Sequence, residues 1–268
     1  MLQIKYIKNV LLFLLAMAPG LTGLAGAQPG ANATDSARPV AVLVELYTSE
    51  GCSTCPPADA FLQTLDQQPV PGVEMVVLSE HVDYWNHDGW KDPFSSTFYT
   101  ERQSAYGRRF GLDNVYTPQM VLDGEEQFVG SDRDAAGKAF TKAVTAPKIA
   151  VHLTAISVGS ANTLHAHLEA EPLSSSPGKP SAEIYVVVAL NHAQSQVARG
   201  ENAGRTLEHT AVAQSMTKVG EIQPGQGFSQ DIQLKLKTGL NPDNLRLVAF
   251  VQEAHQGRVL GATAQSVK

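Results

Sequence analysis

Two cysteines separated by two residues are the side chains best suited to chemistry in this sequence. Cys52 and Cys55 are the only cysteines among 268 residues, and they lie in VELYTSEGCSTCPPADAFL, residues 44–62. An apolar run precedes them and Pro56-Pro57 follows, so the pair should lead from a buried strand into a helix. Amide groups and the dipole at a helix start stabilise a thiolate. We therefore expect Cys52 to be the solvent-facing attacking sulfur and Cys55 to resolve a mixed disulfide.

Three uses of this pair remain open from the residues alone. The first is thiol–disulfide exchange with a protein or small-thiol substrate, which needs no cofactor. The second is a structural disulfide on a non-catalytic binding module of the cell envelope. The third is capture of a soft metal such as Cu(I) by Cys52 and Cys55 with His81 or His87, although a proline beside the sulfurs would crowd that site.

The first 27 residues predict a cleaved export signal. Two lysines flank the start, an apolar core follows at residues 10–18, and small residues occupy positions 25–27. The core is shorter than the roughly 20 residues that span a bilayer, so no membrane insertion is expected after cleavage. A periplasmic or secreted protein would meet an oxidising compartment, where the two cysteines rest as a disulfide. Residues 28–38 are small and polar and predict a linker.

The charge balance disfavours nucleic acid and anionic membranes as partners. The chain has 20 basic and 26 acidic residues, and loss of the two leader lysines takes the formal charge from -6 to -8. No phosphate-binding loop, hydrolase nucleophile turn or paired zinc spacing is present in the sequence. The oligomeric state does not follow from these residues.

Residues 39–147 predict an α/β domain with the element order βαβαββα. Strands are expected at 40–46, 74–78, 116–122 and 127–129, and helices from Pro56, over 94–110 and through Val144. Asp123-Gly124 is typical of a hairpin turn between the last two strands. Parallel strands joined by helices, with an antiparallel hairpin at one side, follow from this order.

Beyond Pro147 the pattern changes, and residues 148–268 predict an all-β, sandwich-like domain. Strand-like segments occur at 149–158, 163–170, 183–190, 228–236 and 245–251. The Gly-rich stretch 200–205 is expected in a long connection of unknown role.

With the motif and the element order in hand, residues 40–144 resemble a thioredoxin-fold domain. Thr117-Pro118, just before a strand, resembles the cis-proline of that superfamily, which faces the disulfide and docks substrate backbone. The resemblance implies a buried carboxylate on the first strand that helps to deprotonate the inner cysteine, and Glu45 is the nearest match.

Four longer segments narrow the resemblance. ELYTSEGCSTCPPAD, SEHVDYWNHDGWKDPF, VYTPQMVLDG and GENAGRTL are similar to a family of exported bacterial proteins classified as thioredoxin-like and of unknown function. The similarity covers nearly all of the expected mature chain and implies a fold and a location, but no activity.

The aromatic loop after the second expected strand supplies further candidates. Because ligands bind at the carboxyl ends of parallel strands, His81 and Trp85 are expected to form a wall of the site with Thr117 and Pro118. The alternative is that Trp85 only packs the loop onto the domain. Glu201 and Arg205 either hold a loop within the β region or bridge it to the cysteine region.

Overall fold

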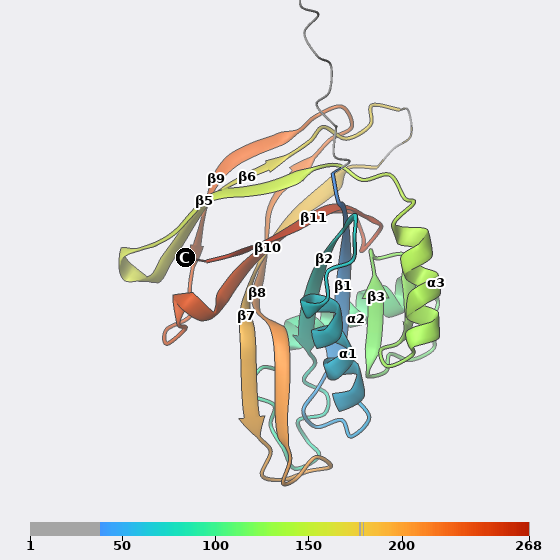
Figure 1. Ribbon diagram of the computed structural model, residues 1–268, viewed down its shortest axis with the longest axis vertical. Helices are drawn as coiled ribbons and strands as arrows, with labels where there is room; N and C mark the ends of the chain where they lie inside the picture. The colour runs from blue at the N-terminus through green and yellow to red at the C-terminus, as the bar shows by residue number, and fades with distance from the viewer. Residues whose placement is uncertain (1–37, 177, 179, 268) are drawn as a thin grey trace, which may run out of the picture. The chain divides into compact units, whose positions relative to one another are not determined.

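The computed structural model describes residues 38–176, 178 and 180–267 (Figure 1). The expected export signal and almost all of the expected linker lie outside these residues. Within them, none of the helices combines the length and the apolar character needed to span a membrane.

The first half of the described chain has the expected element order. Its strands are β1 (Val40–Thr48), β2 (Val73–His81), β3 (Gln119–Leu122) and β4 (Glu126–Val129), and its helices are α1 (Pro56–Gln67), α2 (Thr97–Phe110) and α3 (Arg133–Ala143). Helix α1 starts with Pro56 and Pro57, where the missing N–H groups leave no bond unmade. Helix α3 is capped by Asp132, whose side chain accepts from the backbone N–H groups of Asp134 and Ala135.

The second half is built from strands, and two of them were not expected from the sequence. The strands are β5 (Val151–Gly159), β6 (Thr163–Ala170), β7 (Ala182–Gln196), β8 (Thr206–Ile222), β9 (Phe228–Lys235), β10 (Leu245–Glu253) and β11 (Val259–Ser266). Strands β8 and β11 are the additions, and β7 continues six residues past the expected end at Leu190. Strands β7 and β8 pair along their lengths as one long hairpin.

Strands from both halves form a single eight-stranded mixed sheet in the order β11-β10-β7-β8-β2-β1-β3-β4. Strand β8 lies parallel to β2 and so joins the two halves. The residues from 38 onward accordingly form one compact unit, without a separate β-sandwich domain after Pro147 among the described residues. The physical reason is that β2 would otherwise be a sheet edge with unpaired backbone groups.

Helices cover both faces of the first half of this sheet. Residues of α1 and α3 pack with Val42, Val44 and Leu46 on one face of β1. Tyr99 of α2 packs with Leu43 on the other face. Because side chains alternate along a strand, neighbouring residues of β1 serve opposite cores.

The remaining strands form a small antiparallel sheet in the order β5-β6-β9. Its Leu164 and Leu168 share an apolar core with Ile184 of β7 and Leu247 of β10. Figure 1 shows this small sheet beside the β10–β11 end of the large sheet, while the β7–β8 hairpin runs past α1 in the opposite direction.

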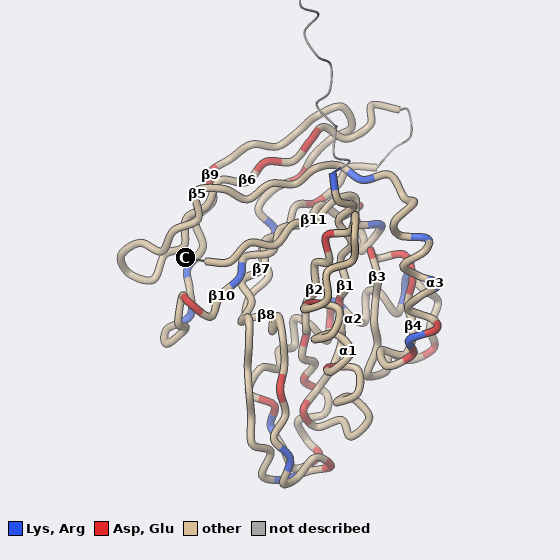
Figure 2. Tube along the Cα trace, in the orientation of Figure 1, with Lys and Arg blue, Asp and Glu red and all other residues tan. Residues whose placement is uncertain are grey.

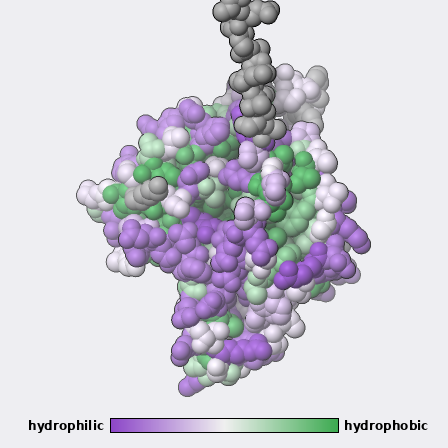
Figure 3. All heavy atoms as spheres, in the orientation of Figure 1, coloured by the Kyte–Doolittle hydropathy of each residue, from purple (hydrophilic) through white to green (hydrophobic). Residues whose placement is uncertain are grey.

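Along the backbone trace in Figure 2, acidic and basic residues are interspersed. On the face drawn in Figure 3, hydrophobic residues gather mainly in the upper part and hydrophilic residues dominate below. Large hydrophobic side chains exposed among the described residues are Val70, Phe98 and Val129.

Candidate functional site

Cys52 and Cys55 form a disulfide immediately before helix α1, with their Cα atoms 5.4 Å apart. The amide N–H of Cys55 donates to the carbonyl of Cys52, and the carbonyl of Cys55 accepts from Ala58 and Asp59 in the first turn of the helix. Both cysteines are fully buried, although Ser53 and Thr54 between them are exposed. The expectation that Cys52 faces solvent is therefore wrong for this structure.

The physical reason is a loop of residues 197–205, which connects β7 to β8 and lies against the cysteine segment. Nδ2 of Asn202 donates to the carbonyls of Glu50 and Cys52, each at 2.9 Å. Oε2 of Glu201 accepts from the amide of Ser53 at 3.0 Å. Of the two alternatives for Glu201, bridging to the cysteine region is the one that the structure shows.

Trp85 connects the cysteine segment to the Thr117–Pro118 segment. Its indole N–H donates to Oγ1 of Thr117 at 2.8 Å. A Cβ atom on Gly51 would lie 2.9 Å from Cβ of Trp85 and 3.3 Å from its backbone oxygen, so glycine is the residue that fits this close approach. The Thr117–Pro118 peptide bond is cis, and Pro118 lies close to Ala58 of α1 across Gly130. The structure thus joins Trp85 to Thr117, with Trp85 beside Gly51 of the cysteine segment and Pro118 near the first turn of α1.

A buried cluster of two acids and a histidine contains one acid that precedes the disulfide in the sequence and one that follows it. Glu50 precedes Cys52 by two residues, and its carboxylate accepts from the indole N–H of Trp90 and lies 3.3 Å from Nε2 of His209. The other ring nitrogen of His209 lies 3.7 Å from Oδ1 of Asp59 on α1. Although burial lowers it, the neighbouring Asp59 and Glu50 raise the pKa of His209 to about 10. His209 is thus a cation held between two carboxylates.

His81 lies against this cluster, away from solvent. Its Nδ1 is 2.7 Å from Oδ2 of Asp92, and its ring contacts the ring of His209 edge-to-face with centroids 4.6 Å apart. Burial alone would raise the pKa of Asp92, but the His81 ring lowers it below its usual range. Nε2 of His81 is buried and has no hydrogen-bond partner among the described residues. His81 is therefore packed beneath the site, next to His209.

Glu45 belongs to a different cluster. Its carboxylate lies 2.7 Å from the Arg102 guanidinium and accepts from the Tyr106 hydroxyl at 2.7 Å, both on α2. Helix α2 covers the face of the sheet opposite to Leu46 and α1. Glu80 completes the group, and burial followed by the charge of Glu45 raises its pKa well above the usual range. These contacts give no support to proton transfer between Glu45 and Cys55.

An open groove runs beside the disulfide, between the start of α1 and the start of β8. It consists of two adjoining hollows of about 390 and 260 Å³ that share Pro56, Thr206 and Leu207. Ser53 and Arg205 line one hollow and Asp59 the other. Arg205 is exposed and donates to Oδ1 of Asn202, so its guanidinium stands at the groove beside the covering loop.

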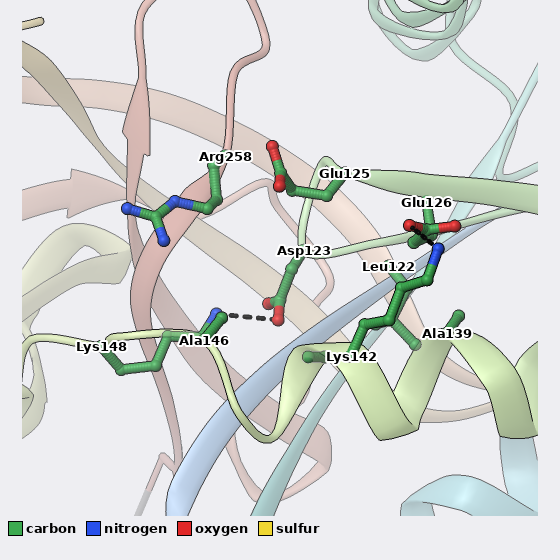
Figure 4. Close-up of a pocket in the computed structure, with 10 residues that line it drawn as sticks. Leu122, Asp123, Glu125, Glu126, Ala139, Lys142, Ala146, Lys148 and Arg258 are labelled. Atoms are coloured by element: carbon green, nitrogen blue, oxygen red, sulfur yellow. Dashed lines mark hydrogen bonds and ion pairs between the residues drawn. The ribbon is translucent and has the colours of Figure 1, made fainter.

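A second, smaller cavity of about 90 Å³ lies under α3 and the β3–β4 turn, away from the cysteines in the fold (Figure 4). Lys148 points at Asp123 there, with Nζ 2.8 Å from the carboxylate. Desolvation lowers the pKa of Lys148 and raises that of Asp123. Lys148 also donates to the carbonyl of Val259, and Asp123 accepts from the amide of Leu43. The pair ties strands of both halves together and is a structural junction.

The described residues hold no group of three His, Cys, Asp or Glu side chains arranged to bind a metal ion. His87, one of the two histidines considered for copper, is exposed and lies near Asp88. The other, His81, is engaged by Asp92.

Some residues of the site were not predicted from the sequence. They either lie far from the cysteines in the chain or occupy a position where their residue type is common for another reason. His209 and Asn202 follow Glu50 by 159 and 152 residues and lie on or beside the unexpected strand β8. Asp59 occupies the first turn of α1, where an acid is expected for the helix dipole alone. The GENAGRTL segment was the one available signal, because it combines Asn202, Glu201 and Arg205.

Solved structures from two bacteria share this fold. Protein AGR_C_4864 from Agrobacterium tumefaciens is 25% identical, with a TM-score of 0.66 over 85% of this chain and 94% of that one. HBP35 of Porphyromonas gingivalis is 16% identical, with a TM-score of 0.63 over 86% of this chain and 76% of that one. A search of curated proteins gave no match.

The sequence similarity extends over most of the site and the fold. Residues 43–252, which include most of β1, the cysteine pair and the loop of residues 197–205, match a family described as "Protein of unknown function (DUF1223)". The chain therefore belongs to the DUF1223 family.

Proposed function

We propose that the protein is a thiol–disulfide oxidoreductase that acts through Cys52 and Cys55 on a protein or small-thiol substrate. The disulfide at the start of α1 supports this proposal, because opening it would leave Cys55 at the positive end of the helix dipole. A thioredoxin-like identity of the first half is part of the proposal. It is supported by the order of elements from β1 to α3 and by the position of Pro118 beside α1.

One observation carries the proposal, namely the buried cluster of Glu50, His209 and Asp59, in which Glu50 and Asp59 flank the cysteine pair in the sequence. Reduction of a disulfide takes up two electrons and two protons, and we propose that these buried ionisable groups supply or accept those protons. A disulfide that only fastens two residues needs no such groups. Burying them costs free energy that apolar side chains would not cost. Their presence at this position favours chemistry.

In the reducing direction, the Cys52 thiolate attacks a disulfide of the substrate and releases one substrate thiolate, which takes up a proton. A mixed disulfide then joins Cys52 to the substrate. The Cys55 thiolate attacks Sγ of Cys52, which breaks the mixed disulfide and releases the second substrate thiolate. The substrate gains two electrons, and the Cys52–Cys55 pair loses them. A dithiol partner is needed to reduce the pair again.

The proposal places the protein in the periplasm or outside the cell, where its disulfide would persist. The lysines and the apolar core of residues 1–27 support an export signal, although these residues lie outside those described. The excess of acidic residues supports partners other than nucleic acid, and the short apolar core supports the absence of membrane insertion after cleavage.

A second candidate function is favoured by the burial of both cysteines. In this alternative the disulfide is a structural link within a binding module and never exchanges. Structural disulfides of secreted proteins have reduction potentials below about -300 mV, whereas exchange-active pairs are more oxidising. The potential therefore separates the two candidates.

The experiment equilibrates the protein with glutathione and dithiothreitol redox buffers and follows the Cys52–Cys55 bond by alkylation and mass spectrometry. We expect a potential above about -300 mV. In cells, Cys55→Ala should accumulate mixed disulfides through Cys52, while the matched variant Cys52→Ser should not. A reduction potential below about -300 mV, together with no mixed disulfide in Cys55→Ala, would contradict the oxidoreductase and favour the binding module.

A further inference from the structure

We propose that the loop of residues 197–205, called here the cap loop, is a built-in cap over the disulfide that must lift before the sulfurs can react. This inference rests on the proposed function, because it concerns access to the same cysteine pair. Attack on a disulfide needs approach to a sulfur atom, and both cysteines are fully buried in the structure. Either the pair does not react, or the part of the protein that covers it moves.

The cap loop holds the cysteine segment through three side-chain contacts. Asn202 uses both N–H bonds of its amide, one on the carbonyl of Glu50 and one on that of Cys52. Glu201 accepts from the amide of Ser53, and the Ser53 side chain, followed by this amide, lowers the pKa of the Glu201 carboxyl. Asn202 is itself buried although it lies in a loop. Three backbone groups of residues 50–53 are thus bonded to side chains of the cap loop, namely the carbonyls of Glu50 and Cys52 and the amide of Ser53.

The cap loop is organised to move as a body. It closes on itself through backbone hydrogen bonds from Val197 to the carbonyl of Arg205 and from Gly204 to that of Val197. Arg205 also fixes the Asn202 amide by donating to its oxygen at 2.9 Å. The loop sits at the end of the long β7–β8 hairpin, which reaches past α1 toward the loops beside it (Figure 1). Lifting it breaks the contacts to residues 50–53 and the close approach of Gly200 to Asp88 and Trp90. It breaks none of the loop's internal bonds.

The neighbouring aromatic loop is the competing cover. Trp85 lies over Gly51, but its indole is fastened to Thr117 and its backbone carbonyl accepts from Asp88. It belongs to the wall formed with Thr117 and Pro118, and its removal would open the packing of that wall. The cap loop is attached to the cysteine segment through polar contacts that water or a partner can replace. This difference favours the cap loop as the part that opens.

The cap loop also borders the groove beside the disulfide. Arg205 lines the hollow that contains Ser53, Pro56 and Pro57. When the cap lifts, the carbonyls of Glu50 and Cys52 and the amide of Ser53 become free at the edge of that groove. These are backbone groups of a turn segment, so the backbone N–H and C=O groups of a substrate peptide can pair with them in place of Asn202 and Glu201.

The experiment measures the rate at which a water-soluble phosphine reduces the native disulfide, because a phosphine needs access to a sulfur atom and no thiol exchange. We expect Asn202→Ala to raise that rate roughly tenfold, since two hydrogen bonds that hold the cap are lost. Glu201→Ala should raise it by about threefold through loss of one exposed contact. Asn244→Ala is the matched control: Asn244 also donates to a backbone carbonyl, that of His192, without contacting residues 50–53. It should leave the rate unchanged.

The same variants are then tested for exchange with glutathione, which reports on the proposed function. Faster phosphine reduction in Asn202→Ala and Glu201→Ala without any exchange would support the proposed cap and contradict the proposed oxidoreductase activity. Exchange in the wild type with equal phosphine rates in all variants would keep the oxidoreductase and overturn the cap. Equal rates together with acceleration by Trp85→Ala would also overturn it, because the aromatic loop would then be the cover. Glu201 is exposed, so its variant stays folded if Asn202→Ala does not.

Discussion

His209 is the residue whose ionisation matters most to the site. Its pKa of about 10 means that it is a cation over the whole physiological range, between Glu50 and Asp59. Because the folded-state pKa lies above the ordinary value near 6.5, the stabilisation from this charge is complete below pH 6.5. It is lost as the pH rises through 10.

Replacement of His209 by Gln should therefore destabilise the protein most at low pH. We expect His209→Gln to lower the free energy of unfolding by about 3 kcal/mol at pH 6, because two buried carboxylates lose their cation. The difference from wild type should shrink steadily toward pH 10. Urea unfolding of the oxidised protein at pH 6, 8 and 10 measures it. His152→Gln, at an exposed histidine of β5, is the control. A difference that stays constant with pH would show that His209 is neutral in the folded protein.

At the scale of single residues, the sequence located the cysteine pair but not the buried ionisable cluster of Glu50, His209 and Asp59. Cys52, Cys55, Trp85, Thr117 and Pro118 were predictable because the motif, the aromatic loop and the Thr-Pro pair each lie next to a recognisable strand or helix. Glu45 was selected by spacing along β1. Spacing does not say which face of a strand meets which helix, and Glu45 meets Arg102 of α2.

At the scale of elements, the difference between the expected and the observed fold comes mostly from strand β8, which was not predicted from the sequence. Exposed and buried residues alternate along β8 up to His209. Beyond it, Ala211 has φ of 51°, and the register with β7 shifts between Val188 and Ala189. Such a bulge changes which side chains point inward, so no single period of two runs through the strand. Strand β11 was missed because Gly261 and two alanines replace the usual β-branched residues. A Cβ on Gly261 would meet the carbonyl of Ile149 at 2.4 Å.

Helix α1 is held to the second half of the chain by a bidentate ion pair. The guanidinium of Arg246 on β10 contacts both carboxylate oxygens of Asp66, at 2.6 and 2.9 Å, and the pair is mostly buried. Thr210 of β8 donates to the same carboxylate. This contact fixes the end of the helix that begins at the cysteines.

Arg246→Lys should keep the charge but lose the paired geometry, and we expect a loss of about 1 kcal/mol in the free energy of unfolding. Arg246→Ala should cost about 3 kcal/mol, because Asp66 keeps its charge without a partner. Chemical denaturation of the two variants measures both values. Arg199→Ala, at an exposed position of the cap loop, controls for loss of one positive charge. Equal stability of Arg246→Lys and Arg246→Ala would show that the fork geometry contributes nothing.

At the scale of the whole molecule, the fold does not divide at Pro147. Leu43 of β1 and Val76 and Leu78 of β2 share a core with Phe250 of β10 and with Val187 of β7. The expected boundary between residues 147 and 148 separates the part of the described chain that contains the α-helices from the part that is built of strands. It does not mark two cores that could form alone.

A fragment of residues 38–147 should therefore fail to fold by itself. Without β8 and β10, the second strand becomes an open edge and an apolar face is exposed to water. We expect the fragment to bind a hydrophobic dye and to lack a cooperative thermal transition, while residues 38–268 unfold in one step. Near-ultraviolet circular dichroism and calorimetry distinguish these outcomes. A cooperative transition of the fragment would restore the two-domain description.

The distance along the chain between the cysteines and Asn202 also sets an order of events. Asn202 follows Cys52 by 150 residues. While the polypeptide emerges from a ribosome or a translocation channel, both thiols are delivered long before the asparagine that will cover them. On the proposed cap, an oxidant that acts on the growing chain would therefore meet an uncovered pair, and residues 197–205 would fold over the bond afterwards.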